Sequence, residues 1–497
     1  MRSSGTLYFL LGAYFLLHVL IRLAMPASLE LDEGQQLFFS QSLSLGYDSQ
    51  PPFYNWLQYG AVQIFGTSVA ALTILKNLLL FLSYMFLGMT ANLLLRDKGL
   101  AAIATLGLVT ITQVSFEAQR DLTHTVAVLF SAGLFIYAFV KTLKQASAWR
   151  YALTGLAVGF GVLSKYNFVL LPLAALIAVL PDRNFRARLF DWRLMLSIVI
   201  AVAVVVPHAW WFFHHTDIAT GRTLGKLIGD EASRIKQIAD GFGALAGAMI
   251  AFALPPLLVF RIAFGRQLPA AWKASTSWSR LIGRMLIVIV LMLILLVLFA
   301  GAGDIRPRWL VPFFFILPLW LCLKIEAAGD VPAFAPRRFG MIAIAFMAVV
   351  LLILGLRSPV MGMLGRYERP NVPYGPAIEA ILATGKQKPS LIVASDEQLA
   401  GNVRLHAKDM PVAVPGFKHL QQVYTFNSSH PVLLIWRGKG ESVSAAPQML
   451  TAWLSSQPAL KGLKLAGSDI ARPYHYGRAG DRYHFSYAWL YPAATAD

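Results

Sequence analysis

The chain has 497 residues, of which 57% are hydrophobic and 14% are charged, and its formal net charge is +18 at pH 7. Soluble globular proteins have about 45–50% apolar and about 25% charged residues, so this composition excludes an ordinary soluble domain and indicates a protein embedded in lipid. The basic residues lie mostly in short segments between apolar runs, which is typical of membrane topology signals and argues against nucleic-acid binding.

Long apolar runs recur over the first 356 residues and predict transmembrane helices, because a bilayer core of about 30 Å requires roughly 20 helical residues. No clear cleavage site follows segment 6–25, so we expect a first span rather than a removed signal peptide. Segments 150–164 and 166–181 are short and form either two spans or one broken helix. The eleven or so predicted spans are 6–25, 68–95, 100–116, 121–140, 150–164, 166–181, 194–213, 241–260, 285–302, 309–323 and 339–356.

The distribution of Lys and Arg predicts which side of the membrane each loop faces. With the N-terminus in the cytoplasm, the inner loops hold most of the basic residues, and the long outer loop 26–67 holds none. We therefore predict a multi-pass protein of a bacterial inner membrane, with an odd number of spans and an exported C-terminus.

The composition changes after about residue 356, where prolines, charges and short strand-like runs replace the long apolar segments. Leu391–Ser395, Val432–Trp436 and Tyr483–Tyr491 predict strands, and Asp396–Leu405 predicts a helix. We therefore divide the chain into a transmembrane domain, 1–356, and a small periplasmic α/β domain, 357–497. The predicted fold class is a mainly α, polytopic helical membrane protein with this small domain at its C-terminus.

The outer loop 26–67 is too polar to span the membrane and unusually aromatic. After Pro51-Pro52, the residues Phe53, Trp56 and Leu57 fall on one helical face. Prolines suit a first helical turn, and aromatic residues suit the headgroup zone. We expect one or two helices lying along the outer membrane surface.

Acidic residues stand at two places on the predicted outer face. Asp32 and Glu33 follow the first span, and because neighbouring helical residues point about 100° apart, one can face a cavity while the other orients a neighbour. Asp121 opens the fourth span beside Arg120. Each acid has two open interpretations: a helix cap or ion pair, or a functional group, since ionisable residues at membrane depth tend to face cavities. Asp32 and Asp121 come from separate segments and could converge on one site.

Basic side chains at the outer face would suit an anionic lipid headgroup such as a phosphate, although each has the alternative of snorkelling to the interface. Lys165 and Arg308 are preferred because each lies in a very short outer turn. His208, His214 and His215 lie at the outer end of a predicted span. For these histidines we favour packing or hydrogen bonding at the membrane interface over binding of a metal ion. The candidate phosphate-binding residues are Lys165, Arg308, Arg306 and Arg222.

In their order along the chain, these pieces resemble the GT-C fold glycosyltransferases, nearest to the branch of the protein O-mannosyltransferases and the lipid A aminoarabinose transferases. The resemblance covers about residues 6–320. The matching residues are Asp32-Glu33, Gln50-Pro51-Pro52-Phe53-Tyr54-Asn55-Trp56-Leu57, Gln119-Arg120-Asp121, Leu163-Ser164-Lys165 and Arg308-Trp309-Leu310-Val311-Pro312, with a looser match at Pro207-His208-Ala209-Trp210-Trp211.

The resemblance implies transfer of a sugar from a polyprenyl-phosphate donor to a hydroxyl of an envelope acceptor, with inversion, at the periplasmic face. Asp32 would be the general base, Asp121 would position the acceptor or the base, and basic side chains would stabilise the leaving phosphate. The acceptor would be lipid A, a polysaccharide or a protein. The residues expected to be catalytic are Asp32, Asp121 and Glu33, and those expected to contact the acceptor or sugar are Tyr54, Trp56, His124 and His208.

One departure concerns Gln50, where the aminoarabinose transferases often have a lysine, so the donor sugar can differ. The sequence has a single cysteine and no nucleotide-binding glycine motif, so we expect no organic cofactor and leave a divalent metal ion open. Two alternatives to an enzyme are a flippase for lipid-linked sugars, which would need more charged residues within its spans than Lys76, and a non-catalytic protein of envelope assembly.

Overall fold

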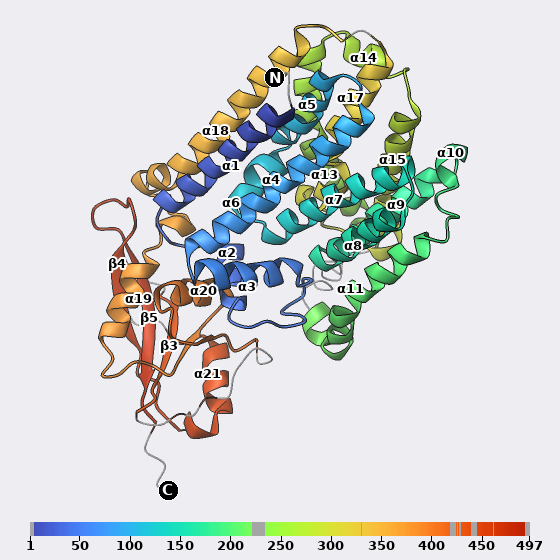
Figure 1. The fold of residues 1–497 in the computed structure, drawn as a ribbon. Coiled ribbons are helices and arrows are strands. Elements are labelled where there is room, and N and C mark those ends of the chain that lie inside the picture. The colour runs from blue at the N-terminus through green and yellow to red at the C-terminus, as the bar shows by residue number, and fades with distance from the viewer. Residues whose placement is uncertain are drawn as a thin grey trace. The chain divides into compact units, whose positions relative to one another are not determined.

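The computed structural model describes residues 4–220, 234–329, 331–417, 424, 426, 429–438, 445–460 and 462–492. The fold is mainly helical with one small sheet, as predicted (Figure 1). The longer helices are α1 (Ser4–Ala24), α3 (Phe53–Phe65), α4 (Val69–Leu94), α7 (Thr123–Lys144), α8 (Ala148–Ser164), α11 (Leu194–His214), α13 (Arg234–Phe264), α15 (Ser277–Ala300), α17 (Leu317–Ala327) and α18 (Ala335–Met363). The shorter helices are α2 (Leu31–Phe39), α5 (Lys98–Leu106), α6 (Ala118–Arg120), α9 (Leu170–Val179), α10 (Arg183–Arg186), α14 (Gln267–Ala271), α16 (Val311–Phe314), α19 (Tyr374–Ala383), α20 (Glu397–His406) and α21 (Gln448–Ser456).

The predicted spans all fall on helical segments, which confirms a multi-pass helical membrane protein. Among the described residues, seven helices are long and apolar enough to cross a membrane alone, and the number is eight if the bent pair Lys98–Thr110 and Gln113–Arg120 is counted as one span. The remaining predicted spans are short or broken, as at Tyr166–Val179. The number eleven therefore stays a prediction.

The chain packs as two compact units. The first unit contains Met1–His18, Asp48–Tyr54 and Lys76–Val350, and the second unit contains Val19–Tyr47, Asn55–Leu75 and Leu351–Asp497. The units cut across the division at residue 356, because most of the outer loop packs with the C-terminal residues.

Helices α7, α8 and α11 are neighbours in the first unit, with α8 contacting both of the others (Figure 1). Glycines of α8 allow α8 and α11 to pack closely. A methyl group at Gly155 would lie 2.3 Å from the Ser197 carbonyl oxygen, and one at Gly159 would lie 2.8 Å from Val204. Membrane helices have little hydrophobic drive to associate and pack closely through such residues. This packing sets the positions of the turn after α8 and of the end of α11.

The sheet of the second unit has the strand order β2-β1-β3-β5-β4. Strands β2, β1 and β3 are parallel, with β2 at the edge of the sheet, whereas β5 pairs antiparallel with β3 and β4. The predicted strands and the predicted helix α20 are confirmed, and β2 and β4 were not foreseen. The strands are β1 (Leu391–Ala394), β2 (Val412–Ala413), β3 (Val432–Arg437), β4 (Ser468–Pro473) and β5 (Arg482–Leu490).

The core on one face of this sheet contains residues from the distant outer loop. Phe38, Phe39 and Tyr47 are buried in the same cluster as Ile392 and Leu433 of the central strands. The loop forms helices α2 and α3, as predicted, and α2 packs against α20 (Figure 1). The expected position of these helices along the membrane surface stays a prediction.

Candidate functional site

The two neighbouring acids of α2 have different surroundings. Glu33 is buried and forms an ion pair with Arg22, with 2.9 Å between Oε2 and the guanidinium nitrogen. The Glu33 carboxylate also accepts a hydrogen bond from the backbone N–H of Glu30 at 3.2 Å, completing a capping box at the start of α2. Asp32 lies in the same first turn and is partly exposed. Glu33 therefore holds the helix start, and Asp32 is the more exposed of the two acids. The role of Asp32 as a base stays a prediction.

The turn that carries Asp121 interrupts the helical course of the first unit. A π-helical turn, Gln113–Glu117, and the short α6 end at Asp121, and the next residue, Leu122, has a left-handed backbone with φ 62°. Such a conformation is uncommon for a side chain of this size and is typical of functional turns.

A buried lysine supports this turn from α4. Lys76 is 2% exposed and donates a hydrogen bond to the Gln119 carbonyl at 2.9 Å, and the Gln119 side chain donates to Asn77 at 2.9 Å. Lys76, the charged residue within a predicted span, thus holds the backbone at Gln119, two residues before Asp121. Asp32 and Asp121 belong to different units, and their convergence on one site stays a prediction.

Lys165 lies in the short turn between α8 and the 3-10 turn Tyr166–Val169, as predicted. Its ammonium group donates to the Thr125 hydroxyl at 2.7 Å, which joins this turn to the first turn of α7. His124, in the same turn of α7, is buried, and its ring lies 6.1 Å from that of Tyr54. The structure therefore brings together three predicted residues, Tyr54, His124 and Lys165, around the start of α7.

His208 on α11 contacts the 3-10 turn that follows Lys165. Its Nε2 and the Tyr166 hydroxyl are 2.9 Å apart, and its ring stacks on Trp211 at a centroid distance of 5.7 Å. His214 and His215 bond back to the carbonyls of their own helix. Over the described residues of the chain, no group of three His, Cys, Asp or Glu residues lies close enough to hold a metal ion.

The two arginines predicted to bind phosphate in the last outer turn, Arg306 and Arg308, have different surroundings. Arg306 is exposed and pairs with Asp304 at 2.6 Å. Arg308 lies in the 3-10 turn Pro307–Trp309, and Asn167 donates to the carbonyl of Trp309 at 3.3 Å, so this turn is tied to the one that follows Lys165. Arg222 lies outside the described residues.

The two predicted aromatic residues, Tyr54 and Trp56, lie in different units, and a buried acid, Asp48, was not predicted. Tyr54 is buried in the first unit, whereas Trp56, in the second unit, donates its indole N–H to the Ser44 carbonyl at 2.7 Å and supports the loop. Asp48 was not among the predicted site residues, yet it is buried and interacts electrostatically with Tyr166. The signal available for Asp48 was an acid three residues before Pro51-Pro52 in a loop without basic residues.

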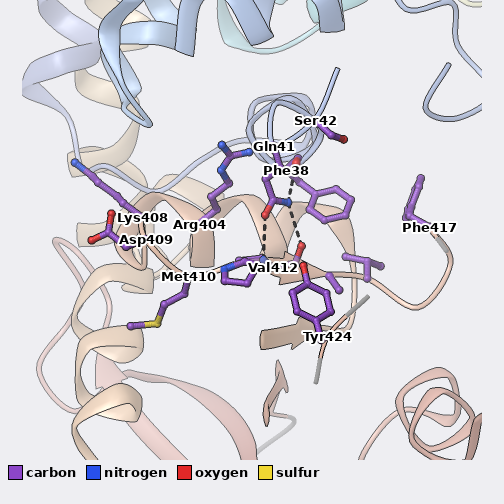
Figure 2. A pocket seen from close by; sticks show the side chains of 13 residues that line it. Phe38, Gln41, Ser42, Arg404, Lys408, Asp409, Met410, Val412, Phe417 and Tyr424 are labelled. Carbon is purple, nitrogen blue, oxygen red and sulfur yellow. Dashed lines mark hydrogen bonds between the residues drawn. The ribbon is translucent and has the colours of Figure 1, made fainter. Parts of the chain in front are cut away.

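The second unit contains a cavity of about 240 Å³ between α2 and the end of α20. Figure 2 shows Gln41 at this cavity, where its side chain bonds to the backbone of Val412. Of the predicted site residues that the structure describes, none lines the cavity.

Comparison with known proteins identifies the class. Residues 49–211 match the family model described as dolichyl-phosphate-mannose-protein mannosyltransferase. The fold is similar to that of ArnT from Cupriavidus metallidurans, solved bound to undecaprenyl phosphate, with a TM-score of 0.60 over 97% of this chain and 98% of that one, at 13% identity. The family model and the similar fold, together with the relatives described next, define a multi-pass membrane glycosyltransferase of the GT-C type.

The nearer similarity is to enzymes of Rhizobium johnstonii. The chain is 45% identical to the lipopolysaccharide core galacturonosyltransferase RgtB over 98% of both chains, and 41% identical to RgtA over 99% of this chain and 98% of that one. It is 25% identical to the lipid A galacturonosyltransferase RgtD over 39% of this chain and 40% of that one. The protein belongs to the family of the lipopolysaccharide core galacturonosyltransferases. This membership decides for an enzyme over the flippase and assembly-protein interpretations.

Proposed function

We propose that this enzyme transfers a galacturonic acid residue from a polyprenyl-phosphate carrier to a hydroxyl of the lipopolysaccharide core, at the periplasmic face of the inner membrane. The observation that carries the proposal is the end-to-end similarity to two enzymes named for this transfer. A lipid-phosphate donor is supported by the similar fold of ArnT, which was solved with undecaprenyl phosphate.

In the proposed reaction, Asp32 accepts the proton of the acceptor hydroxyl as its oxygen attacks the anomeric carbon. The bond from that carbon to the phosphate oxygen breaks, polyprenyl phosphate leaves with the bonding electrons, and the anomeric configuration inverts. The geometry supports Asp32 rather than Glu33 as this base, because Asp32 is partly exposed, whereas Glu33 is buried and caps α2. Glu33 acts as a positioning residue.

The first unit supplies the other proposed roles. Lys165 and Arg308, in linked turns, would stabilise the negative charge that grows on the departing phosphate, with Arg306 and Arg222 as further candidates. Asp121 would position the acceptor, and Tyr54, His124 and His208 would contact the sugar or its acceptor. Trp56 would act through the loop that it supports. The transmembrane domain, residues 1–356, would be catalytic, and residues 357–497 would lie in the periplasm.

Mass spectrometry of the lipopolysaccharide core tests this proposal. We expect core from cells that lack the gene to be lighter by one hexuronic acid residue than core from cells complemented with it. The purified enzyme should restore that mass when supplied with polyprenyl-phosphate-linked galacturonic acid. A missing mass of another sugar, or a change confined to protein, would overturn the assignment of donor or acceptor.

A further inference from the structure

We propose that the C-terminal residues of the second unit position the general base: Gln398, Gly401 and Asn402 of α20 form a clamp that fixes the start of α2. The inference rests on the proposed role of Asp32. It gives residues 357–497 a role in the reaction without contact with a substrate.

The clamp holds the backbone of Leu29, three residues before Asp32. The Asn402 side-chain oxygen accepts the N–H of Leu29 at 2.9 Å, and the Gln398 side chain donates to the carbonyl of Leu29 at 2.7 Å. Gln398, Asn402 and Leu29 are all buried. A buried peptide group without partners is costly, so these two amides define where the chain enters α2.

The side-chain oxygen of Gln398 is itself held by two partners. It accepts hydrogen bonds from the Tyr374 hydroxyl at 3.0 Å and from the Arg437 guanidinium. Arg437 in turn pairs with Asp396, which caps α20 by accepting the N–H of Leu399 at 3.0 Å. The amide nitrogen of Gln398 is therefore oriented toward Leu29 by charged groups at the carboxyl ends of β1 and β3.

The two helices are in backbone contact. A methyl group at Gly401 would lie 1.9 Å from the Gly34 carbonyl oxygen, and one at Gly34 would lie 2.8 Å from the Gln398 carbonyl oxygen. No other residue fits at either position while the helices keep this separation. The first two turns of α2 therefore rest directly on α20.

The far end of α2 is also fixed to the C-terminal residues. Gln41 donates to the Val412 carbonyl and accepts the Val412 N–H, both at 3.0 Å, as a paired strand would (Figure 2). Arg404 donates to the Leu37 carbonyl at 2.9 Å, and burial lowers the pKa of Arg404 to about 10. The helix that carries Asp32 is thus attached at both ends.

The clamp predicts a loss of rate with little loss of binding. A general base must hold its geometry closely, and a displacement of about 1 Å can cost roughly 100-fold in rate. Gln398→Glu keeps the oxygen that bonds Tyr374 and Arg437 and removes the donor to Leu29. We expect its kcat to fall about 10- to 100-fold, with KM for the lipid-linked donor within about twofold.

Two properties of the full-length enzyme in nanodiscs are measured for each variant. They are the turnover with polyprenyl-phosphate-linked galacturonic acid and the rate of backbone hydrogen exchange over residues 28–40. Exchange there should accelerate in Gln398→Glu and Gly401→Ala. Ser486→Ala, which removes a partly buried hydrogen bond to Asp469 on β4, and Gly416→Ala, where a methyl group meets open space, are the controls. Both controls should keep kcat and the exchange rate of 28–40.

Wild-type kcat in Gln398→Glu with accelerated exchange would overturn the positioning role, and unchanged exchange in both clamp variants would overturn the clamp itself. Asp32→Asn is measured in parallel. Full activity in Asp32→Asn would refute the proposed base, and the exchange data would still decide whether the clamp holds α2.

Discussion

At the scale of single residues, the two adjacent acids of α2 have different surroundings within one helix turn. Glu33 reaches back to Arg22 and to the N–H of Glu30, and these contacts remove it from solvent. Asp32 points about 100° away on the helix and stays partly exposed. The same arrangement explains why two consecutive carboxylates need not repel each other, since Arg22 neutralises one of them.

The substitution Glu33→Gln separates these roles. It keeps an oxygen for the cap and leaves the Arg22 charge without its partner, and breaking a buried ion pair typically costs about 3–5 kcal/mol. We expect a lower midpoint of thermal unfolding, and transfer by the remaining folded enzyme to be reduced less than tenfold. Differential scanning fluorimetry in detergent and kinetics corrected for folded fraction measure the two effects. A wild-type midpoint with abolished transfer would instead make Glu33 the general base.

At the scale of elements, the close packing of α8 on α11 sets the turn that holds Lys165. Gly155 and Gly159 are four residues apart and both lie against α11. Gly243 and Gly247 of α13 have the same spacing, yet a methyl group at either position meets nothing within 4 Å. A spacing motif in the sequence therefore marks an interface in one helix and an open surface in the other.

This contrast predicts opposite results for two matched substitutions. Gly155→Ala places a methyl group 2.3 Å from the Ser197 carbonyl, so α8 and α11 must separate, and we expect a lower unfolding midpoint and weaker transfer. Gly243→Ala should leave the midpoint unchanged or slightly higher, because alanine is favoured over glycine within a helix by about 0.5–1 kcal/mol. Equal midpoints for the two variants would contradict the proposed interface.

At the scale of the whole molecule, the sequence predicted the local features well. The apolar spans, β1, β3, β5 and α20 depend on patterns within a few residues, and the structure confirms them as helices and strands. The short outer turn of Lys165 was likewise predicted. Segments 100–116, before Asp121, and 309–323, after Arg308, were predicted as plain spans, whereas the structure breaks both of them. Such breaks depend on contacts with other segments, such as that of Lys76 with Gln119.

What the sequence could not predict is the partnership between distant segments. Leu29 and Asn402 are 373 positions apart, and neither carries a pattern that indicates the other. The ion pair of Glu33 likewise could not be predicted without the location of Arg22 in the fold. Asp48 was overlooked because its burial follows from the packing of the first unit rather than from its neighbours in sequence.

The most direct measurement is the turnover of Asp32→Asn, purified in nanodiscs with polyprenyl-phosphate-linked galacturonic acid and lipopolysaccharide core as substrates. General-base catalysis typically contributes about 10²–10⁴-fold, so kcat should fall by at least about 100-fold, with the unfolding midpoint and the KM for the donor retained. Turnover within a few fold of the wild type would show that another group takes the proton, and would contradict the account.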